Sequence, residues 1–100
     1  MSRDIGFKTP ARREFDKAIA WYDRREPGLG ARFEAAVNSV LDRVKTHPEQ
    51  FPRVGRAARK ARVLNFHAYN IYFFADQDKI TVVAVHDGRR DPEKLRRRLQ

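Results

Sequence analysis

Residues 63–85, VLNFHAYNIYFFADQDKITVVAV, decide the fold class of this chain. Three runs rich in β-branched and aromatic residues lie within this stretch, at Val63–Phe66, Tyr69–Ala75 and Ile80–Val85. The links between them, His67-Ala68 and residues 76–79, are short enough to join antiparallel neighbours. The stretch therefore predicts an antiparallel meander of three strands.

The middle run of the meander is apolar on both of its faces. Ile71 and Phe73 alternate with Tyr72 and Phe74, a pattern typical of a central strand covered on both sides. A single pair of helices covers only one face of a sheet. We therefore expect the C-terminal segment, or a partner, to cover part of the other face.

A short strand and two helices are expected before the meander. Ile5 and Phe7 alternate with polar neighbours and predict the strand, and Thr9-Pro10 has the form of an N-cap followed by a proline in the first helical turn. Pro27-Gly28 separates two helical patterns, the second of which continues to Pro48. The apolar positions at helical spacing are Ala11, Phe15, Ala18, Ile19 and Tyr22 in the first helix, and Leu29, Phe33, Ala36, Val37, Val40, Leu41 and Val44 in the second.

A short last helix completes the predicted fold. Asp91-Pro92 repeats the cap-and-proline signal ahead of Glu93–Leu99. The expected class is α+β, in the order β-α-α-β-β-β, with an antiparallel helix hairpin packed on a mainly antiparallel sheet. At 100 residues the chain is expected to form one domain over 1–100.

Charge is concentrated in the second half of the chain. The net charge is +9, of which residues 1–50 contribute +2 and residues 51–100 contribute +7. Such an excess suits an acidic partner, either nucleic acid or an acidic protein segment, or a surface that is merely solubilising. The sequence has no cysteine and no long apolar run. We therefore expect a cytoplasmic protein with no membrane span, no metal site and no cofactor.

Four stretches resemble the RelE/ParE toxin superfamily of type II toxin–antitoxin systems, and its ParE-like branch in particular. They span nearly the whole chain in the family's order: residues 18–23 (AIAWYD), 27–33 (PGLGARF), His47-Pro48 through Phe51-Pro52, and residues 82–85 (VVAV) followed by Arg89-Arg90-Asp91-Pro92. The resemblance implies a toxin that a cognate antitoxin neutralises, with the antitoxin's C-terminal segment wrapped over the basic surface.

Three departures from the family pattern bear on mechanism. Ala68-Tyr69 stands where the family often has Pro-Tyr, and Phe73 stands where it commonly has a tyrosine. The family's late histidine aligns with Asp87, whereas His86 lies one residue earlier. A shift of one residue on a strand turns the side chain to the opposite face, so the resemblance gives His86 no catalytic role.

The resemblance leaves two mechanisms open, and a third hypothesis stands beside them. ParE-like members are taken to bind and poison DNA gyrase, whereas RelE-like members resemble ribonucleases of ribosome-bound messenger RNA. For RNA cleavage the candidates are His86 as acid or base, Tyr69 or Tyr72 as proton donor, and Arg59, Arg62 and Arg89 as phosphate clamps. Few acid–base groups are available, which favours gyrase. The third hypothesis is a non-toxic basic binding module.

The candidate binding residues lie in two basic segments. One segment has no acidic residue and leads into the predicted sheet, and the other follows the last predicted strand. Together they are expected to form the two rims of a groove for antitoxin or target: Arg53, Arg56, Arg59, Lys60 and Arg62 on one side, and Arg89 and Arg90 on the other. Arg96, Arg97 and Arg98 are expected to form an amphipathic last turn or a frayed end.

Overall fold

The computed structural model describes residues 2–100; Met1, which the expected domain includes, lies outside the described residues. A five-stranded mixed sheet has the order β1-β5-β4-β3-β2, in which β1 is parallel to β5 and the other neighbours are antiparallel. Its strands are β1 (Asp4–Phe7), β2 (Arg53–Val54), β3 (Ala58–Arg62), β4 (Tyr69–Ala75) and β5 (Lys79–Asp87). The helices are α1 (Thr9–Arg25), α2 (Leu29–Thr46), the short 3-10 helix η1 (Pro48–Gln50) and α3 (Pro92–Leu99).

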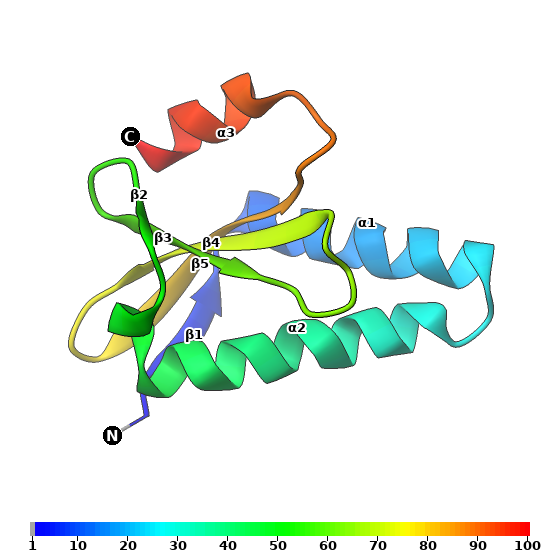
Figure 1. Cartoon of the computed structure of the whole chain (residues 1–100), viewed down its shortest axis with the longest axis horizontal. Helices are drawn as coiled ribbons and strands as arrows, with labels where there is room; N and C mark the ends of the chain where they lie inside the picture. The colour runs from blue at the N-terminus through cyan, green and yellow to red at the C-terminus, as the bar shows by residue number, and fades with distance from the viewer. Residues whose placement is uncertain (1) are drawn as a thin grey trace.

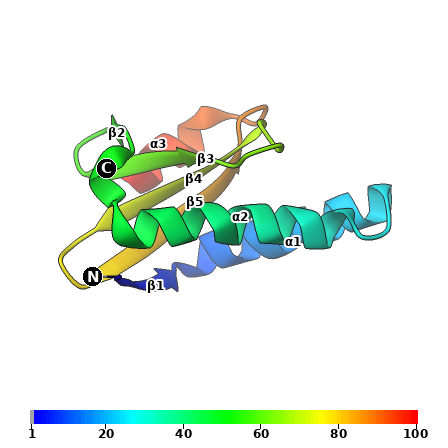
Figure 2. The ribbon, with the colours of Figure 1, turned by 60° about the horizontal axis from the view of Figure 1, so that its bottom comes forward.

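The helix hairpin of α1 and α2 covers one face of the sheet, and α3 lies on the other (Figure 1). Figure 2 shows the two long helices side by side, with the sheet behind them. Phe15, Phe33 and Val37 from the hairpin pack against Ile71 and Phe73 of β4, all of them at most 2% exposed. The predicted α+β class, the hairpin and the central position of β4 are confirmed.

The turn between α1 and α2 depends on one aspartate and two glycines. Asp23 Oδ1 accepts hydrogen bonds from the backbone N–H groups of Gly28 and Gly30, both at 3.1 Å. Gly28 has a φ of 89°, in the left-handed region that favours glycine. A Cβ on Gly30 would lie 2.5 Å from the carbonyl oxygen of Ile19. The two glycines therefore permit a tight turn and a close approach of the two helices.

A second, smaller apolar cluster lies between α3 and the sheet. Leu95 of α3 packs on Tyr72, Val83 and Ala84, with Leu99 at its margin. Asp91 caps α3 as the sequence predicts, because its Oδ1 accepts the Glu93 N–H at 3.0 Å. The C-terminal segment therefore covers part of the second sheet face.

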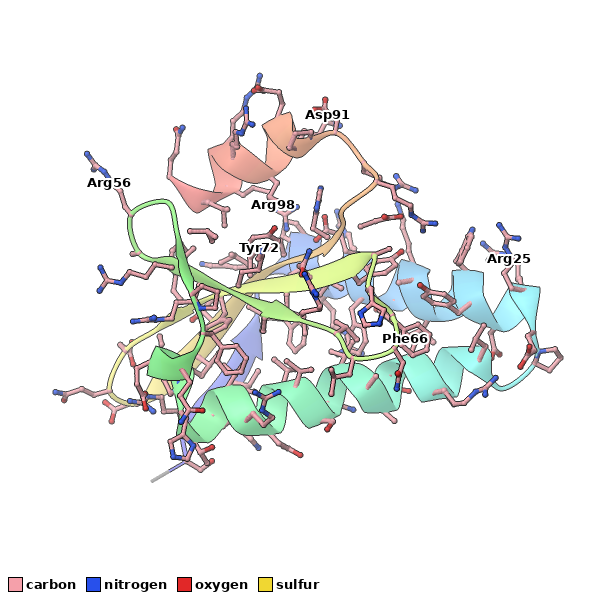
Figure 3. All side chains as sticks on the ribbon, in the orientation of Figure 1. Arg25, Arg56, Phe66, Tyr72, Asp91 and Arg98 are labelled. Atoms are coloured by element: carbon pink, nitrogen blue, oxygen red, sulfur yellow. The ribbon has the colours of Figure 1, made fainter. Side chains whose placement is uncertain are left out.

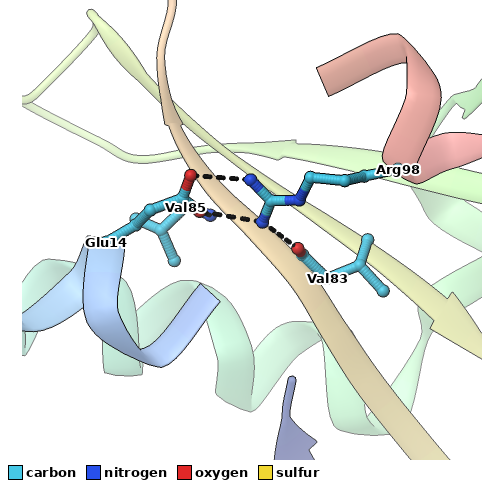
Figure 4. A network of polar contacts seen from close by, with 4 residues as sticks. All are labelled: Glu14, Val83, Val85 and Arg98. Atoms are coloured by element: carbon cyan, nitrogen blue, oxygen red, sulfur yellow. Dashed lines mark hydrogen bonds and ion pairs between the residues drawn. The ribbon is translucent and has the colours of Figure 1, made fainter. Parts of the chain in front are cut away.

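Arg98 and Glu14 fasten α3 to the sheet (Figure 4). The pairing of β1 with β5 ends at Phe7 and Val82. Beyond it, Glu14 Oε1 accepts the Val85 N–H at 3.0 Å, and the Arg98 guanidinium donates to both Glu14 oxygens, at 2.7 and 3.0 Å, and to the Val83 carbonyl. The two side chains satisfy the edge of β5 where β1 no longer reaches it. Arg98 is an anchor and not part of a frayed end.

The predicted strand at Val63–Phe66 is wrong, and the strand lies one segment earlier at Ala58–Arg62. Asn65 has a φ of 68°, and the Phe66 N–H donates to the Val63 carbonyl, so this segment turns. Val63 is buried and Phe66 half-buried. Both fill the core from a loop, which gives the segment a strand-like composition without a strand's geometry.

The start of α1 also differs from the prediction. The helix begins at Thr9 itself, Lys8 occupies the N-cap position, and no side chain caps it. The Lys8 N–H instead donates to the Val82 carbonyl at 2.9 Å. The strand pairing of β1 therefore continues directly into the helix. None of the helices described is long and apolar enough to cross a membrane.

Candidate partner-binding surface

The basic segment before the meander forms the β2–β3 hairpin at one edge of the sheet. Arg53 on β2 and Arg56 in the turn are exposed, and the labelled Arg56 projects away from the body of the molecule (Figure 3). Neither has an acidic partner within the described part of the chain, residues 2–100. Both guanidinium groups are therefore free to meet an acidic partner.

Strand alternation divides the other basic residues of the hairpin between the two sheet faces. Arg59 is paired with the buried Phe73 on the helix side, and its Nη1 donates to the Phe51 carbonyl at 2.7 Å. That bond ties the bend after α2 to β3. Lys60 and Arg62 point to the opposite face. The basic segment is therefore not the single rim that the sequence predicts.

Arg62 begins a polar row that crosses three strands on the α3 side of the sheet. Arg62 of β3 is paired with Asn70 of β4, which is paired with His86 of β5. Two strand spacings place Arg62 and His86 about 10 Å apart. Asn70 Oδ1 and His86 Nε2 are buried and have no hydrogen-bond partner, and Tyr72 is edge-on to His86 at 6.3 Å between ring centroids.

Tyr69 lies on the other face of the sheet from His86. Its ring packs on Tyr22 and Phe33 in the main core, at 5.9 and 5.1 Å between centroids. Burial raises the pKa of its phenol, and the nearby Asp87 raises it further. Tyr72 also has a pKa raised by burial, and it is the tyrosine that shares a face with His86.

Arg89 and Arg90 follow β5 at the end of the sheet. Arg89 forms a two-pronged ion pair with Asp87, at 2.9 and 3.0 Å. The hydrogen bond from Arg89 holds the pKa of the Asp87 carboxyl below its usual value, and Asp87 in turn raises the pKa of Arg89. The side chain of Arg90 is exposed. Arg90 is thus the freer of the two cations for an external partner.

The structure brings together only part of the residue set considered for RNA cleavage. His86 and Arg62 share the polar row, Tyr69 is separated from them by the sheet, and Arg89 is engaged by Asp87. The arrangement offers cations and one histidine on the α3 side. Its proton donor would have to be Tyr72, which is 8% exposed.

A shallow hollow on α2 is a feature that the sequence does not reveal. It is lined by Leu29, Arg32, Ala35 and Ala36 of α2, and by Asn65 and Phe66 of the β3–β4 loop. The labelled Phe66 lies over α2 (Figure 3). Beside it Leu64 is 56% exposed, as the one large hydrophobic residue so exposed in residues 2–100. The sequence carries a local signal only for the turn beside the hollow, because Asn65, which follows Leu64, is a residue type that tolerates the left-handed conformation.

The described residues do not form a candidate metal site. Within residues 2–100, no three side chains of His, Asp or Glu come together in a way that could hold a metal ion. The chemistry of this surface therefore comes from its guanidinium groups, its apolar hollow and its polar row.

Comparison with known proteins identifies a family and finds solved structures of similar fold. The family model described as the ParE toxin of the type II toxin–antitoxin system, parDE, matches residues 5–92. The solved structure of the chromosomal ParDE TA system from P. aeruginosa is similar with a TM-score of 0.73, covering 86% of this chain and 96% of that chain at 10% identity. That similarity is one of fold. No curated protein sequence matches the chain.

Proposed function

Because this chain belongs to the ParE toxin family of type II toxin–antitoxin systems, we propose that it inhibits DNA gyrase by binding it and that a cognate antitoxin neutralises it. Membership of the family is the observation that carries the proposal. In this proposal gyrase and the antitoxin each bind the surface of the toxin. Because gyrase and its DNA lie in the cytoplasm, the toxin would act there.

The layout of the charged side chains supports binding over catalysis. Cleavage of RNA needs an acid, a base and cations converging on one phosphate. Here the residues considered for those roles are distributed over both sheet faces, with Tyr69 in the main core. Arg53 and Arg56 are exposed on the β2–β3 hairpin, and Arg90 is exposed after β5 at the opposite end of the sheet. Such cations suit an acidic protein surface.

The test is expression of the toxin alone in a bacterial host, with DNA and protein synthesis followed by labelled precursors. Inhibition of gyrase predicts that DNA synthesis falls first while translation continues. Purified toxin should also reduce supercoiling by purified gyrase. A library of genomic fragments from the source organism then selects, by rescue of growth, the antitoxin gene. If no fragment rescues growth, the neutralisation half of the proposal fails.

The polar row is the observation that favours the second candidate, cleavage of ribosome-bound messenger RNA. Arg62, Asn70 and His86 are adjacent across three strands. This candidate predicts an early collapse of translation, and a steep loss of toxicity in His86→Ala with antitoxin binding intact. Normal growth on expression of the toxin alone would instead favour the third candidate, a non-toxic basic binding module.

A further inference from the structure

A row of side chains on α1 lies on the side of the helix that faces α3. Glu14 marks this side, because its carboxylate accepts from Arg98 of α3 at 2.7 and 3.0 Å (Figure 4). Lys17, Trp21 and Arg25 follow Glu14 at intervals of three, four and four residues, and residues so spaced lie on one face of a helix. Lys17 and Arg25 are exposed, and the labelled Arg25 projects away from α2 (Figure 3). This side of α1 is therefore basic beyond Glu14.

Two further cations join this row from α3. Lys94 lies about one helical turn before Arg98, and therefore on the face of α3 that is turned to Glu14. Arg97 is next to Arg98, and both Lys94 and Arg97 are exposed. The two helices therefore present cations on both sides of the Glu14–Arg98 pair. We call the surface formed by these residues the α1–α3 flank: Arg13, Lys17, Trp21 and Arg25 of α1, with Lys94 and Arg97 of α3.

Each acidic side chain of α1 and α3 is already engaged within the protein. Asp23 binds the turn after α1. The other three form ion pairs: Glu14 with Arg98, Asp16 with Arg12, and Glu93 with Arg96. The cations of the flank form no ion pair with any carboxylate in residues 2–100. Their positive charge is therefore not offset by a neighbour on the same surface.

We propose that the α1–α3 flank binds the phosphate backbone of double-stranded DNA. From Arg13 to Arg25 the helix rises by about 18 Å, which is the length of about five base pairs of duplex. Lysine and arginine side chains bind phosphate oxygens without reading the base sequence, so this contact is independent of sequence. The inference rests on the proposed function only for the choice of DNA over RNA, because gyrase holds duplex DNA.

The composition of the flank favours nucleic acid over an acidic protein. The centre of a protein–protein interface is depleted in charged residues, whereas interfaces with DNA are much more positively charged. Trp21 is half-buried, and the Arg25 guanidinium lies over its ring at 4.3 Å. Leu64, the large hydrophobic residue that is exposed in residues 2–100, lies beside α2 instead. An acidic protein would find little apolar surface on the flank.

The place of the flank in the fold leaves another surface free for a protein partner. α1 follows β1 at one edge of the sheet, whereas Arg53 and Arg56 lie on the β2–β3 hairpin at the other edge. A toxin that holds a protein through the hairpin can therefore contact DNA through the flank. On gyrase, such a contact adds the enzyme's own DNA to the surfaces that hold the toxin.

Fluorescence anisotropy of a short labelled DNA duplex tests the proposal with purified toxin and no gyrase. Affinity should fall with added salt, by about 0.9 in the slope of log affinity against log salt for each phosphate contact. Replacing Lys17, Arg25 and Lys94 together by alanine should lower that slope by about 2–3 and weaken binding about tenfold or more at low salt. Duplexes of different sequence should bind equally.

The matched control replaces Arg53, Arg56 and Arg62 by alanine, which removes the same charge from the other edge of the sheet. This control should keep nearly the slope of the original chain. Equal losses in the two triple variants would show an effect of net charge alone and overturn the assignment to the flank. Absence of salt-dependent binding by the original chain would overturn the proposal as a whole.

Trp21 gives a second readout that needs no variant. It is the single tryptophan of the chain, so its fluorescence reports on the flank alone. Bound duplex should protect Trp21 from quenching by acrylamide, and lack of protection at saturation contradicts the proposal. If polyglutamate of equal charge protects Trp21 better than DNA, the flank is a surface for acidic protein, and better protection by duplex RNA overturns the choice of DNA.

The supercoiling activity of gyrase separates this inference from the proposed function. A toxin that inhibits purified gyrase but does not bind the free duplex contradicts the inference alone. A toxin that binds the duplex through the flank but leaves gyrase active contradicts the proposed function alone. Circular dichroism checks that both triple variants fold, and if the flank variant does not, protection of Trp21 in the original chain decides.

Discussion

Gly30 sets how closely the two helices of the hairpin can approach each other. Any side chain at this position would meet the Ile19 carbonyl oxygen, because a Cβ there would lie 2.5 Å from it. Backbone atoms of a packed helix yield less readily than the end of a flexible side chain. The same residue donates its N–H to Asp23, so displacing it also weakens the cap of α2.

We therefore expect Gly30→Ala to lower the free energy of unfolding by about 1–3 kcal/mol, as overpacking does in other cores. Urea denaturation followed by circular dichroism measures it. Gly28→Ala is the matched control, since nothing lies within 4 Å of its Cβ and only its positive φ costs about 1 kcal/mol. A Gly30→Ala protein as stable as the original chain would show that the hairpin adjusts freely.

Tyr69 links the core to the pH dependence of stability. Burial raises the pKa of its phenol above the ordinary value of 10.0, and Asp87 raises it further. In the unfolded chain the phenol ionises near pH 10, while in the folded protein it stays protonated. The stability that this group contributes is therefore complete below pH 10 and is lost as the pH rises through the folded pKa.

Tyr69→Phe should make the loss of stability between pH 9 and pH 11 shallower, because the ring still packs but no longer ionises. The midpoint of urea unfolding at each pH measures the slope for both proteins. Tyr22 and Tyr72 also have raised pKa values, so part of the slope should remain. A variant whose slope matches that of the original chain would contradict a buried, protonated Tyr69.

The position of α3 depends on a small set of contacts. Two leucines and the ion pair between Arg98 and Glu14 hold it to the sheet. The pair is partly buried, with 27% and 31% of the two side chains exposed. Since Glu14 also accepts the Val85 N–H, the pair couples three elements, α1, β5 and α3.

Arg98→Ala should cost about 1–3 kcal/mol of unfolding free energy, because it leaves a partly buried carboxylate and a strand carbonyl without their donor. Limited proteolysis should cut within residues 92–100 sooner than in the original chain. Arg97→Ala is the control, since Arg97 is exposed and should change stability by less than about 0.5 kcal/mol. Equal proteolysis of the two variants would show that the leucines alone hold α3.

The elements also show which parts of the fold and site were predictable. The strand Tyr69–Ala75 was predicted with its bounds. Apolar side chains lie on both of its faces, a pattern typical of a central strand. The β2–β3 hairpin was missed because Ala58 and Ala61 face the interior among arginines and a lysine, a composition that resembles a solvated loop. The basic residues were predicted as candidate binding residues, but their division between the two sheet faces depends on β3, which the sequence pattern does not reveal. The hollow on α2 needs residues from two distant segments, which no local pattern brings together.

At the scale of the whole molecule, the positive charge is spread over surfaces with different freedom to bind. Arg53, Arg56 and Arg62 are exposed, whereas Arg59 donates to the Phe51 carbonyl and Arg89 is held by Asp87. Electrostatic attraction to an acidic partner weakens with added salt, since ions screen exposed charges over about 8 Å at physiological ionic strength. Only the free cations should contribute strongly to that dependence.

Replacing Arg53, Arg56 and Arg62 together by alanine should therefore flatten the decline of antitoxin affinity between 50 and 500 mM salt, mainly through a slower association rate at low salt. Arg59→Ala should leave the slope nearly unchanged and lower the stability of the toxin instead, by about 1 kcal/mol for one lost hydrogen bond. Calorimetric titration over a series of salt concentrations measures the slopes, and urea denaturation measures the stabilities. An unchanged slope in the triple variant would remove the β2–β3 hairpin from the binding surface, and a slope altered by Arg59→Ala would show that its bond to Phe51 opens when the partner binds.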